Sequence, residues 1–226
     1  MRELLQTRVV AHTGQKVQFR FHPVMHLLDG DSFGAVCEMS QTFEESASFG
    51  PMSAASKAAD PAKWLSDRLS EVASAAHQMD QRMRPIIVPS PMAALSHANT
   101  AIACDAAIRR TTLCQQEICL EFEDSAFAGC PSDVVRHVAH LRRHGFRVSV
   151  DMRKSWQTPI GEGLRLLIDS LRVDARDLEM NEKLMDICEV ASASGMLVIA
   201  ENANWRDGEF LNRIGIHAGS KLRADS

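Results

Sequence analysis

The stretch EICLEFEDSAFAGCPSDVVRHVAHLRRHGFRVSVD, residues 117–151, decides the fold. Its two ends, 117–125 and 146–151, are short, apolar and rich in β-branched and aromatic residues, as buried strands are. Residues 131–145 between them have an acidic start, a basic last turn and a stopping Gly145, which is the pattern of a helix. A strand, a helix and a second strand of these lengths predict two parallel strands joined by a helical crossover.

The rest of the chain continues this alternation in both directions. Helical spacing of apolar residues predicts helices at 61–83, 92–111, 160–169 and 180–194. Apolar runs predict strands at 84–91, 170–175 and 196–202. The order predicts an α/β fold built on a mostly parallel sheet.

The N-terminal part differs from this pattern. Residues 17–29 and 32–39 flank the turn Asp29-Gly30-Asp31, which predicts a hairpin and therefore one antiparallel strand pair. Residues 46–59 are rich in Ser, Ala and Gly, which predicts a loop or lid. With 226 residues and 45% hydrophobic content, we expect a single domain, 1–226, with one large core.

Composition excludes several classes of protein. The net charge of -4 provides no basic excess, so we expect no nucleic-acid partner. The six cysteines form no CxxC pair, which argues against a zinc ribbon and a disulfide framework, and predicts buried thiols in a reducing cytoplasm. The chain has no apolar run near the ~20 residues of a membrane span and begins with no signal-peptide pattern, so we expect a cytoplasmic protein without membrane contact.

Acidic residues stand at the carboxyl ends of nearly all the predicted strands. In an α/β barrel these ends meet on one face, where carboxylates repel one another unless cations or protons compensate them. This clustering predicts a metal site, or the remains of one, suited to Mg or Mn. Taken singly, each acid is equally explained as a solvated turn residue. The acids are Glu38, Glu121, Glu123, Asp124, Asp151, Asp174 and Glu201.

Four segments, in order, resemble motifs of the EAL family of cyclic-di-GMP phosphodiesterases. Residues 38–40 stand where Glu-Ala-Leu is usual, LEFEDS at 120–125 is similar to LEITES, residues 172–174 stand at the KID motif, and VIAEN at 198–202 resembles VIAEG. The resemblance runs from about Phe19 to Gly219. It implies a modified TIM-like (β/α)8 barrel, with an N-terminal hairpin giving one antiparallel strand. The family-equivalent residues are Glu38, Glu121, Asp151, Arg172 and Glu201.

Departures from the family pattern decide the expected activity. The family's asparagine ligand falls at Val88 or Pro89, its second aspartate at Met152 and its lysine at Arg172, which cannot exchange a proton near neutrality. The loss of ligands weakens a metal site strongly. We therefore predict no useful hydrolysis, no competent catalytic residue and no cofactor, with Mg or Mn as the metal if one is kept. The remnant metal ligands are Glu38, Glu121, Asp151 and Glu201.

Arg172 suggests a hypothesis about the altered site. Its guanidinium could lie among Glu121, Asp151 and Glu201 and neutralise them in place of the lost metal. The alternative is that arginine replaced lysine without a new role.

Whether the chain still binds cyclic-di-GMP depends on a few residues near the mouth of the barrel, the end where the acids stand. Thr42 stands where the family has a phosphate-contacting arginine. Arg153 and Lys154 could supply a replacement charge, and Trp156 could stack on a guanine or simply pack on the barrel rim. With Asp174, these three residues form the predicted ligand-binding set.

Three functions compete. The first is a catalytically inactive EAL-like regulatory domain that acts through protein–protein contact in bacterial signalling. The second is a cyclic-di-GMP receptor that does not hydrolyse its ligand. The third is a residual metal-dependent phosphodiesterase with Glu123 or Asp124 as a substitute ligand. We expect a protein partner, and the family resemblance allows a homodimer.

Overall fold

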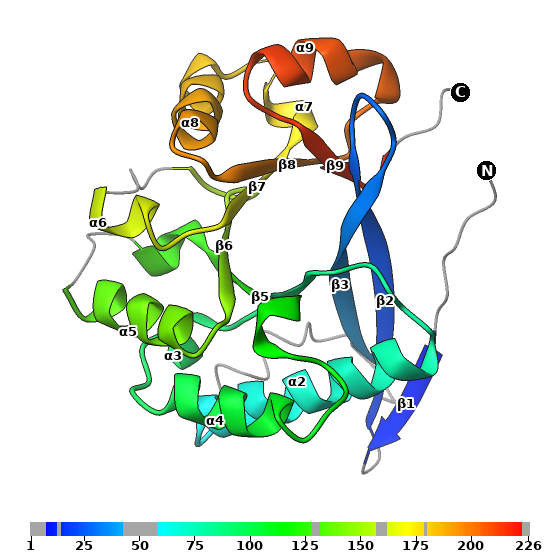
Figure 1. Cartoon of the computed structure of the whole chain (residues 1–226), viewed down its shortest axis with the longest axis vertical. Helices are drawn as coiled ribbons and strands as arrows, with labels where there is room; N and C mark the ends of the chain where they lie inside the picture. The colour runs from blue at the N-terminus through cyan, green and yellow to red at the C-terminus, as the bar shows by residue number, and fades with distance from the viewer. Residues whose placement is uncertain are drawn as a thin grey trace.

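The computed structural model describes residues 8–12, 15–42, 58–127, 132–156, 162–178 and 180–222. Their strands form one sheet in chain order, and pairing of β2 with β9 closes strands β2 to β9 into a barrel (Figure 1). Strand β1 (Arg8–His12) extends the sheet beside β2, outside the closed ring. The barrel strands are β2 (Gln15–His26), β3 (Ser32–Thr42), β4 (Ile86–Pro89), β5 (Ile118–Glu123), β6 (Arg147–Asp151), β7 (Ser170–Asp174), β8 (Leu197–Glu201) and β9 (Ala218–Ser220).

Strand directions confirm the predicted hairpin and the modified TIM-like barrel. Strand β2 is antiparallel to β1, β3 and β9, whereas β3 through β9 run parallel. In the β2–β3 turn, Asp31 N donates to Asp29 Oδ1 at 2.9 Å, and Gly30 has a φ of +77°. Glycine adopts this left-handed conformation without steric cost.

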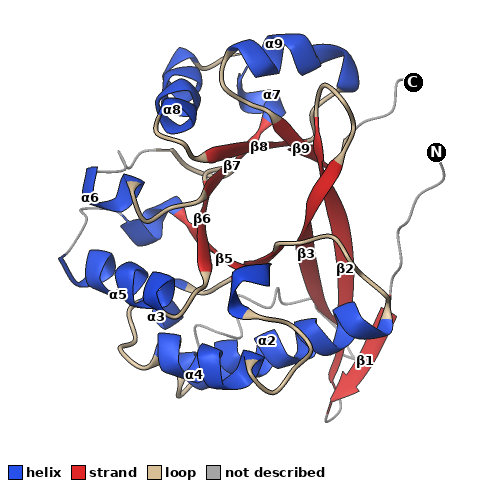
Figure 2. Cartoon of the chain, in the orientation of Figure 1, coloured by secondary structure: helices blue, strands red, loops and turns tan. Residues whose placement is uncertain are grey.

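Helices cover the outside of the barrel except on the side formed by β2 and β3, where the described residues place none (Figure 2). Helix α2 starts where Asp60 accepts a hydrogen bond from Lys63 N at 2.9 Å and Pro61 occupies the first turn, and its apolar face, with Leu65 and Leu69, packs into the core. The helices are α2 (Pro61–Gln78), α3 (Met92–Leu95), α4 (Thr100–Ile108), α5 (Ser132–Arg143), α6 (Glu162–Arg165), α7 (Ala175–Leu178), α8 (Glu182–Ala193) and α9 (Gly208–Arg213). Short 3₁₀ helices are η1 (Gln115–Glu117), η2 (Asp124–Phe127) and η3 (Trp205–Asp207).

Several predicted boundaries were wrong. The helix expected at 92–111 is split into α3 and α4, because residues 96–99 turn and Thr100 Oγ1 donates to Ala94 O at 2.5 Å across the break. The helix expected at 61–83 ends at Gln78, just before Asp80 with a φ of +49°. The helix expected at 160–169 ends at Arg165, and strand β1, strand β9, helix α7 and helix α9 were not predicted. The predicted loop at 46–59 lies mostly outside the described residues.

Two apolar regions fill the fold. The larger lies between the sheet and the helices and contains Phe122, while the smaller lies inside the barrel and contains Cys119. Side chains alternate between the two regions along a barrel strand, so Glu121 faces the interior like Cys119, nearer the carboxyl end of β5. The acids of the mouth therefore lie above an apolar interior.

The cysteines differ in one respect from the prediction. Cys37, Cys104, Cys119 and Cys188 are buried free thiols, but Cys114 is exposed in the connection between α4 and β5. Burial raises the pKa of Cys104 to about 12. None of the helices in the described ranges is long and apolar enough to cross a membrane.

Candidate functional site

The carboxyl ends of the parallel strands bring the predicted acids together. Glu121 on β5, Asp151 on β6 and Glu201 on β8 are buried, with side-chain exposures of 1%, 9% and 4%. Glu38 is 46% exposed and does not end its strand as predicted, because β3 continues along β2 to Thr42 after its pairing with β4 has ended at Val36. We call Glu38, Glu121, Asp151 and Glu201 the mouth carboxylates.

Arg172 on β7 lies among three of the mouth carboxylates. Its Nε donates to Glu121 Oε1 at 2.8 Å and its Nη2 donates to Glu121 Oε2, a two-bond contact that fits a guanidinium to a carboxylate. Arg172 Nη2 lies 3.8 Å from Asp151 Oδ2, and Nη1 lies 3.6 Å from Glu201 Oε2. The guanidinium, 2% exposed, is therefore where the charge hypothesis expected it.

Arg153 is a second cation in the same cluster. Its Nε and Nη2 donate to the two oxygens of Asp151 at 2.9 and 2.8 Å, and its Nη1 donates to Glu201 Oε2. The sequence predicted a phosphate contact for Arg153, but in this structure its guanidinium is turned to two mouth carboxylates.

Lys221 is a third cation, which the sequence analysis missed. Its Nζ lies 2.8 Å from Glu201 Oε1 and 3.7 Å from Glu38 Oε2, and Glu38 also contacts His22 Nε2 at 2.7 Å. Lys221 has a φ of +49°, a conformation that non-glycine residues seldom adopt and that often marks functional sites. Because Lys221 directly follows the unpredicted strand β9, no sequence pattern pointed to it.

These cations change the proton affinities of the acids. Burial acts to raise the pKa of Asp151, but hydrogen bonds from Arg153 and the charge of Arg172 outweigh it and hold the pKa below its usual value. For Glu201, burial is likewise outweighed by the Lys221 hydrogen bond and the Arg153 charge, so its pKa is lowered. Burial raises the pKa of Glu121, and the Arg172 charge only partly opposes this.

Acid should therefore weaken the fold through Asp151. A carboxyl group whose pKa is lowered by folding stabilises the protein above its unfolded pKa of about 4, and that contribution is lost as pH falls through the folded pKa. The raised pKa of Glu121 acts in the opposite sense. We expect the urea midpoint of the wild type to fall more steeply below about pH 4 than that of Asp151→Asn. Parallel pH profiles for the two proteins would show that the lowered pKa of Asp151 contributes nothing to the pH dependence of stability.

The other predicted ligand-binding residues lie around the cluster. Lys154 Nζ donates to Glu123 Oε1 at 2.8 Å, and both side chains are exposed. Trp156 is half-buried and packs against the larger core. Two further acids also have partners within the protein: Asp174 accepts from Arg176 Nε at 2.9 Å and Asn202 Nδ2 at 3.0 Å, and Asp124 accepts from Ser155 Oγ at 2.7 Å. The side chain of Thr42 lies outside the described residues.

The residues of the mouth do not fit the metal site that the resemblance implies. Val88 and Met152 are fully buried in the larger core, and neither they nor Pro89 carry a side-chain oxygen for Mg or Mn. Guanidinium nitrogens lie between the mouth carboxylates and would repel a divalent cation. Within the described parts of the chain, no three His, Cys, Asp or Glu side chains are placed to hold a metal ion.

Comparisons with known proteins address the fold. No protein-family model matches the sequence, and no curated protein matches it. The solved structure of the PaMucR phosphodiesterase in complex with c-di-GMP is 17% identical, has a TM-score of 0.71, and matches over 90% of this chain and 88% of that one. A manganese/cyclic-di-GMP complex of BlrP1 from Klebsiella pneumoniae is 15% identical with a TM-score of 0.71, over 95% of this chain and 56% of that one.

A third solved structure is an EAL domain protein from Listeria monocytogenes, 13% identical with a TM-score of 0.66, over 90% of this chain and 85% of that one. At these identities the likeness is one of fold. The chain therefore has the EAL-domain fold that its sequence motifs predicted.

Proposed function

We propose that this chain is a catalytically inactive EAL-type domain that acts through contact with another protein in bacterial signalling. The observation that carries the proposal is the pairing of every mouth carboxylate with a basic side chain of the same chain. Arg172, Arg153 and Lys221 neutralise Glu121, Asp151 and Glu201, and Lys221 and His22 contact Glu38.

Hydrolysis of a phosphodiester by paired metals requires carboxylate oxygens that can hold the cations and orient the attacking water. In this mouth, both oxygens of Glu121 accept N–H groups of Arg172, and both oxygens of Asp151 accept N–H groups of Arg153. An arginine also remains protonated near neutrality and therefore supplies no general base. These ion pairs are therefore suited to stabilising the fold and not to holding metal ions for hydrolysis.

The ion pairs also weigh against nucleotide binding. A phosphate can take Arg153 only if the buried carboxylates of Asp151 and Glu201 lose that partner. A receptor that binds cyclic-di-GMP without hydrolysis is the second candidate, because the PaMucR and BlrP1 structures are complexes with this dinucleotide.

Calorimetric titration with cyclic-di-GMP, in Mn, in Mg and in EDTA, with product analysis of the same samples, tests the proposal. We expect no heat of binding and no linear dinucleotide in any buffer, because the mouth is neutralised internally. Metal-dependent product would overturn the proposal, provided that it disappears in Glu121→Gln and so does not come from a contaminant. Binding without product would instead support the receptor.

A further inference from the structure

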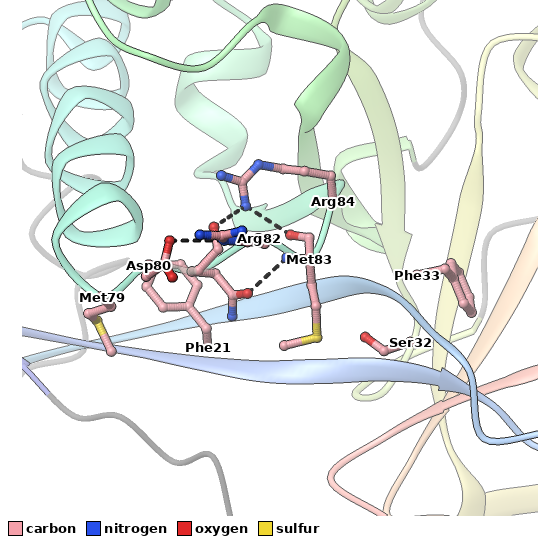
Figure 3. A pocket seen from close by; sticks show the side chains of 9 residues that line it. Phe21, Ser32, Phe33, Met79, Asp80, Arg82, Met83 and Arg84 are labelled. Atoms are coloured by element: carbon pink, nitrogen blue, oxygen red, sulfur yellow. Dashed lines mark hydrogen bonds and ion pairs between the residues drawn. The ribbon is translucent and has the colours of Figure 1, made fainter.

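A hollow of about 640 Å³ opens at the end of the barrel opposite the mouth carboxylates. It lies where β3 begins and where the chain from α2 enters β4, both at the amino ends of parallel strands. Figure 3 shows its side chains between the end of α2 and the β2–β3 hairpin. We call it the floor pocket, and it is lined by Phe21, Ser32, Phe33, Met79, Asp80, Gln81, Arg82, Met83 and Arg84.

The apolar part of the floor pocket is formed largely by adaptable side chains. Met79 and Met83 are half-buried and pack against the larger core, and Phe21 is buried beneath them at 3% exposure. Methionine is unbranched and polarisable, and surfaces that accept varied peptide side chains use it often. The volume falls within the range of pockets that enclose a ligand group.

Cations form the rim of this apolar surface. Arg82 is 84% exposed and its carboxylate partner, Asp80, is 77% exposed, so the pair is easily exchanged for another. Arg84 is engaged within the protein, because its Nη1 donates to Gln81 O at 2.7 Å and Met83 O at 3.0 Å and its buried Nε lies 3.3 Å from Glu117 Oε1. Arg82 is therefore the rim cation that can turn to an incoming carboxylate.

A further cation lies close to the same surface. Phe33 lines both the floor pocket and a smaller cavity of about 80 Å³, which Arg147 also lines. Arg147 is exposed, and its Nε donates to a backbone carbonyl, Gln116 O, at 3.1 Å. Arg147 thus adds a second exposed cation near the pocket, while Asp169 lines the same smaller cavity.

We propose that the floor pocket is the docking site for the protein partner, and that it takes a segment with an apolar side chain beside Asp or Glu. This inference rests on the proposed function and names the surface that serves it. The apolar side chain fills the space over Met79 and Met83, and the carboxylate exchanges for Asp80 on Arg82. An apolar centre with an arginine rim is typical of protein interfaces. The net charge of -4 disfavours a nucleic acid at the same place.

A library of random dodecapeptides displayed on phage and selected on the wild-type protein is the probe. We expect the enriched peptides to carry Leu, Met or Phe next to Asp or Glu. A synthetic copy of the most enriched peptide should bind Arg82→Glu at least about tenfold more weakly than the wild type, because the rim charge is reversed. Met83→Ala should also weaken it, through loss of apolar contact.

Arg136→Glu is the matched control, because Arg136 is 67% exposed and lies on α5 away from the pocket lining. It should bind the peptide like the wild type, and thermal unfolding should show all three variants folded. Basic peptides, or peptides that bind Arg82→Glu unchanged, would overturn the proposal. So would binding to vesicles of phosphatidylcholine and phosphatidylglycerol that Arg82→Glu abolishes, which would assign the pocket to a lipid surface. Neither result depends on cyclic-di-GMP turnover, so the two proposals fail separately.

Discussion

Replacing Arg172 by alanine should lower the free energy of unfolding by about 3–5 kcal/mol, because removal of one partner leaves a buried carboxylate uncompensated. Arg172 is 2% exposed and Glu121 is 1% exposed, so water cannot take over the lost interactions. Urea unfolding followed by circular dichroism measures the change.

Two variants test whether the loss of stability comes from the unpaired buried carboxylate and not simply from the removal of an arginine. Arg176→Ala removes a 61%-exposed partner of Asp174 and should leave the urea midpoint nearly unchanged. Arg172→Met combined with Glu121→Leu should recover much of the lost stability, because apolar residues of similar volume can replace a buried ion pair. An unchanged midpoint in Arg172→Ala would show that this arginine does not neutralise the mouth.

Phe122→Ala should also lower the free energy of unfolding by about 3–5 kcal/mol, through lost apolar contact and the cavity that remains. Phe122 is fully buried on β5 and packs edge-to-face on Phe127, with ring centroids 6.5 Å apart. It also lies between Glu121 and Glu123, so it fixes the strand that carries both acids. The same urea experiment measures the loss.

Phe210→Ala is the matched control for Phe122, because Phe210 is 40% exposed on α9. Its truncation should shift the midpoint much less, since the ring already contacts water. Equal shifts in the two variants would mean that Phe122 does not have the core role that its burial indicates.

The parallel part of the fold could be predicted because its signals are local. The strand at 146–151 and the helix at 131–145 differ in the spacing of their apolar residues, in length and in the residues at their ends. The structure contains β6 and α5 within two residues of these bounds. The hairpin around Gly30 was equally clear, because its turn residues match the backbone conformation that they adopt.

The closing strand β9 could not be predicted for a physical reason. Its sequence, Ala218-Gly219-Ser220, has no branched or aromatic residue and no strand period. A Cβ at Gly219 would overlap Leu222 Cδ2 and lie 2.9 Å from Leu27 Cδ2, so a larger residue there would have to displace two leucine side chains. Tertiary contact, and not local preference, makes this segment a strand.

The functional site also has a part that the sequence predicts and a part that only tertiary contacts determine. The acids could be predicted because parallel strands deliver their carboxyl ends to one face, which needs only the order of the strands. Arg172 could be predicted as a partner of the acids because it lies on a barrel strand beside them. Arg153 and Lys221 could not, since they reach Glu201 from a loop and from beyond β9, and their side-chain directions depend on neighbours distant in the sequence.

Closure of the barrel by β9 also sets the order of events during synthesis. Strand β2 is made early, yet its pairing of Val24 with Ser220 must wait until nearly the whole described chain has left the ribosome. Until then the β2 edge presents unpaired backbone N–H and C=O groups, which are templates for unwanted pairing with other chains. A chain that lacks β9 therefore has an open barrel with an exposed strand edge, which favours aggregation.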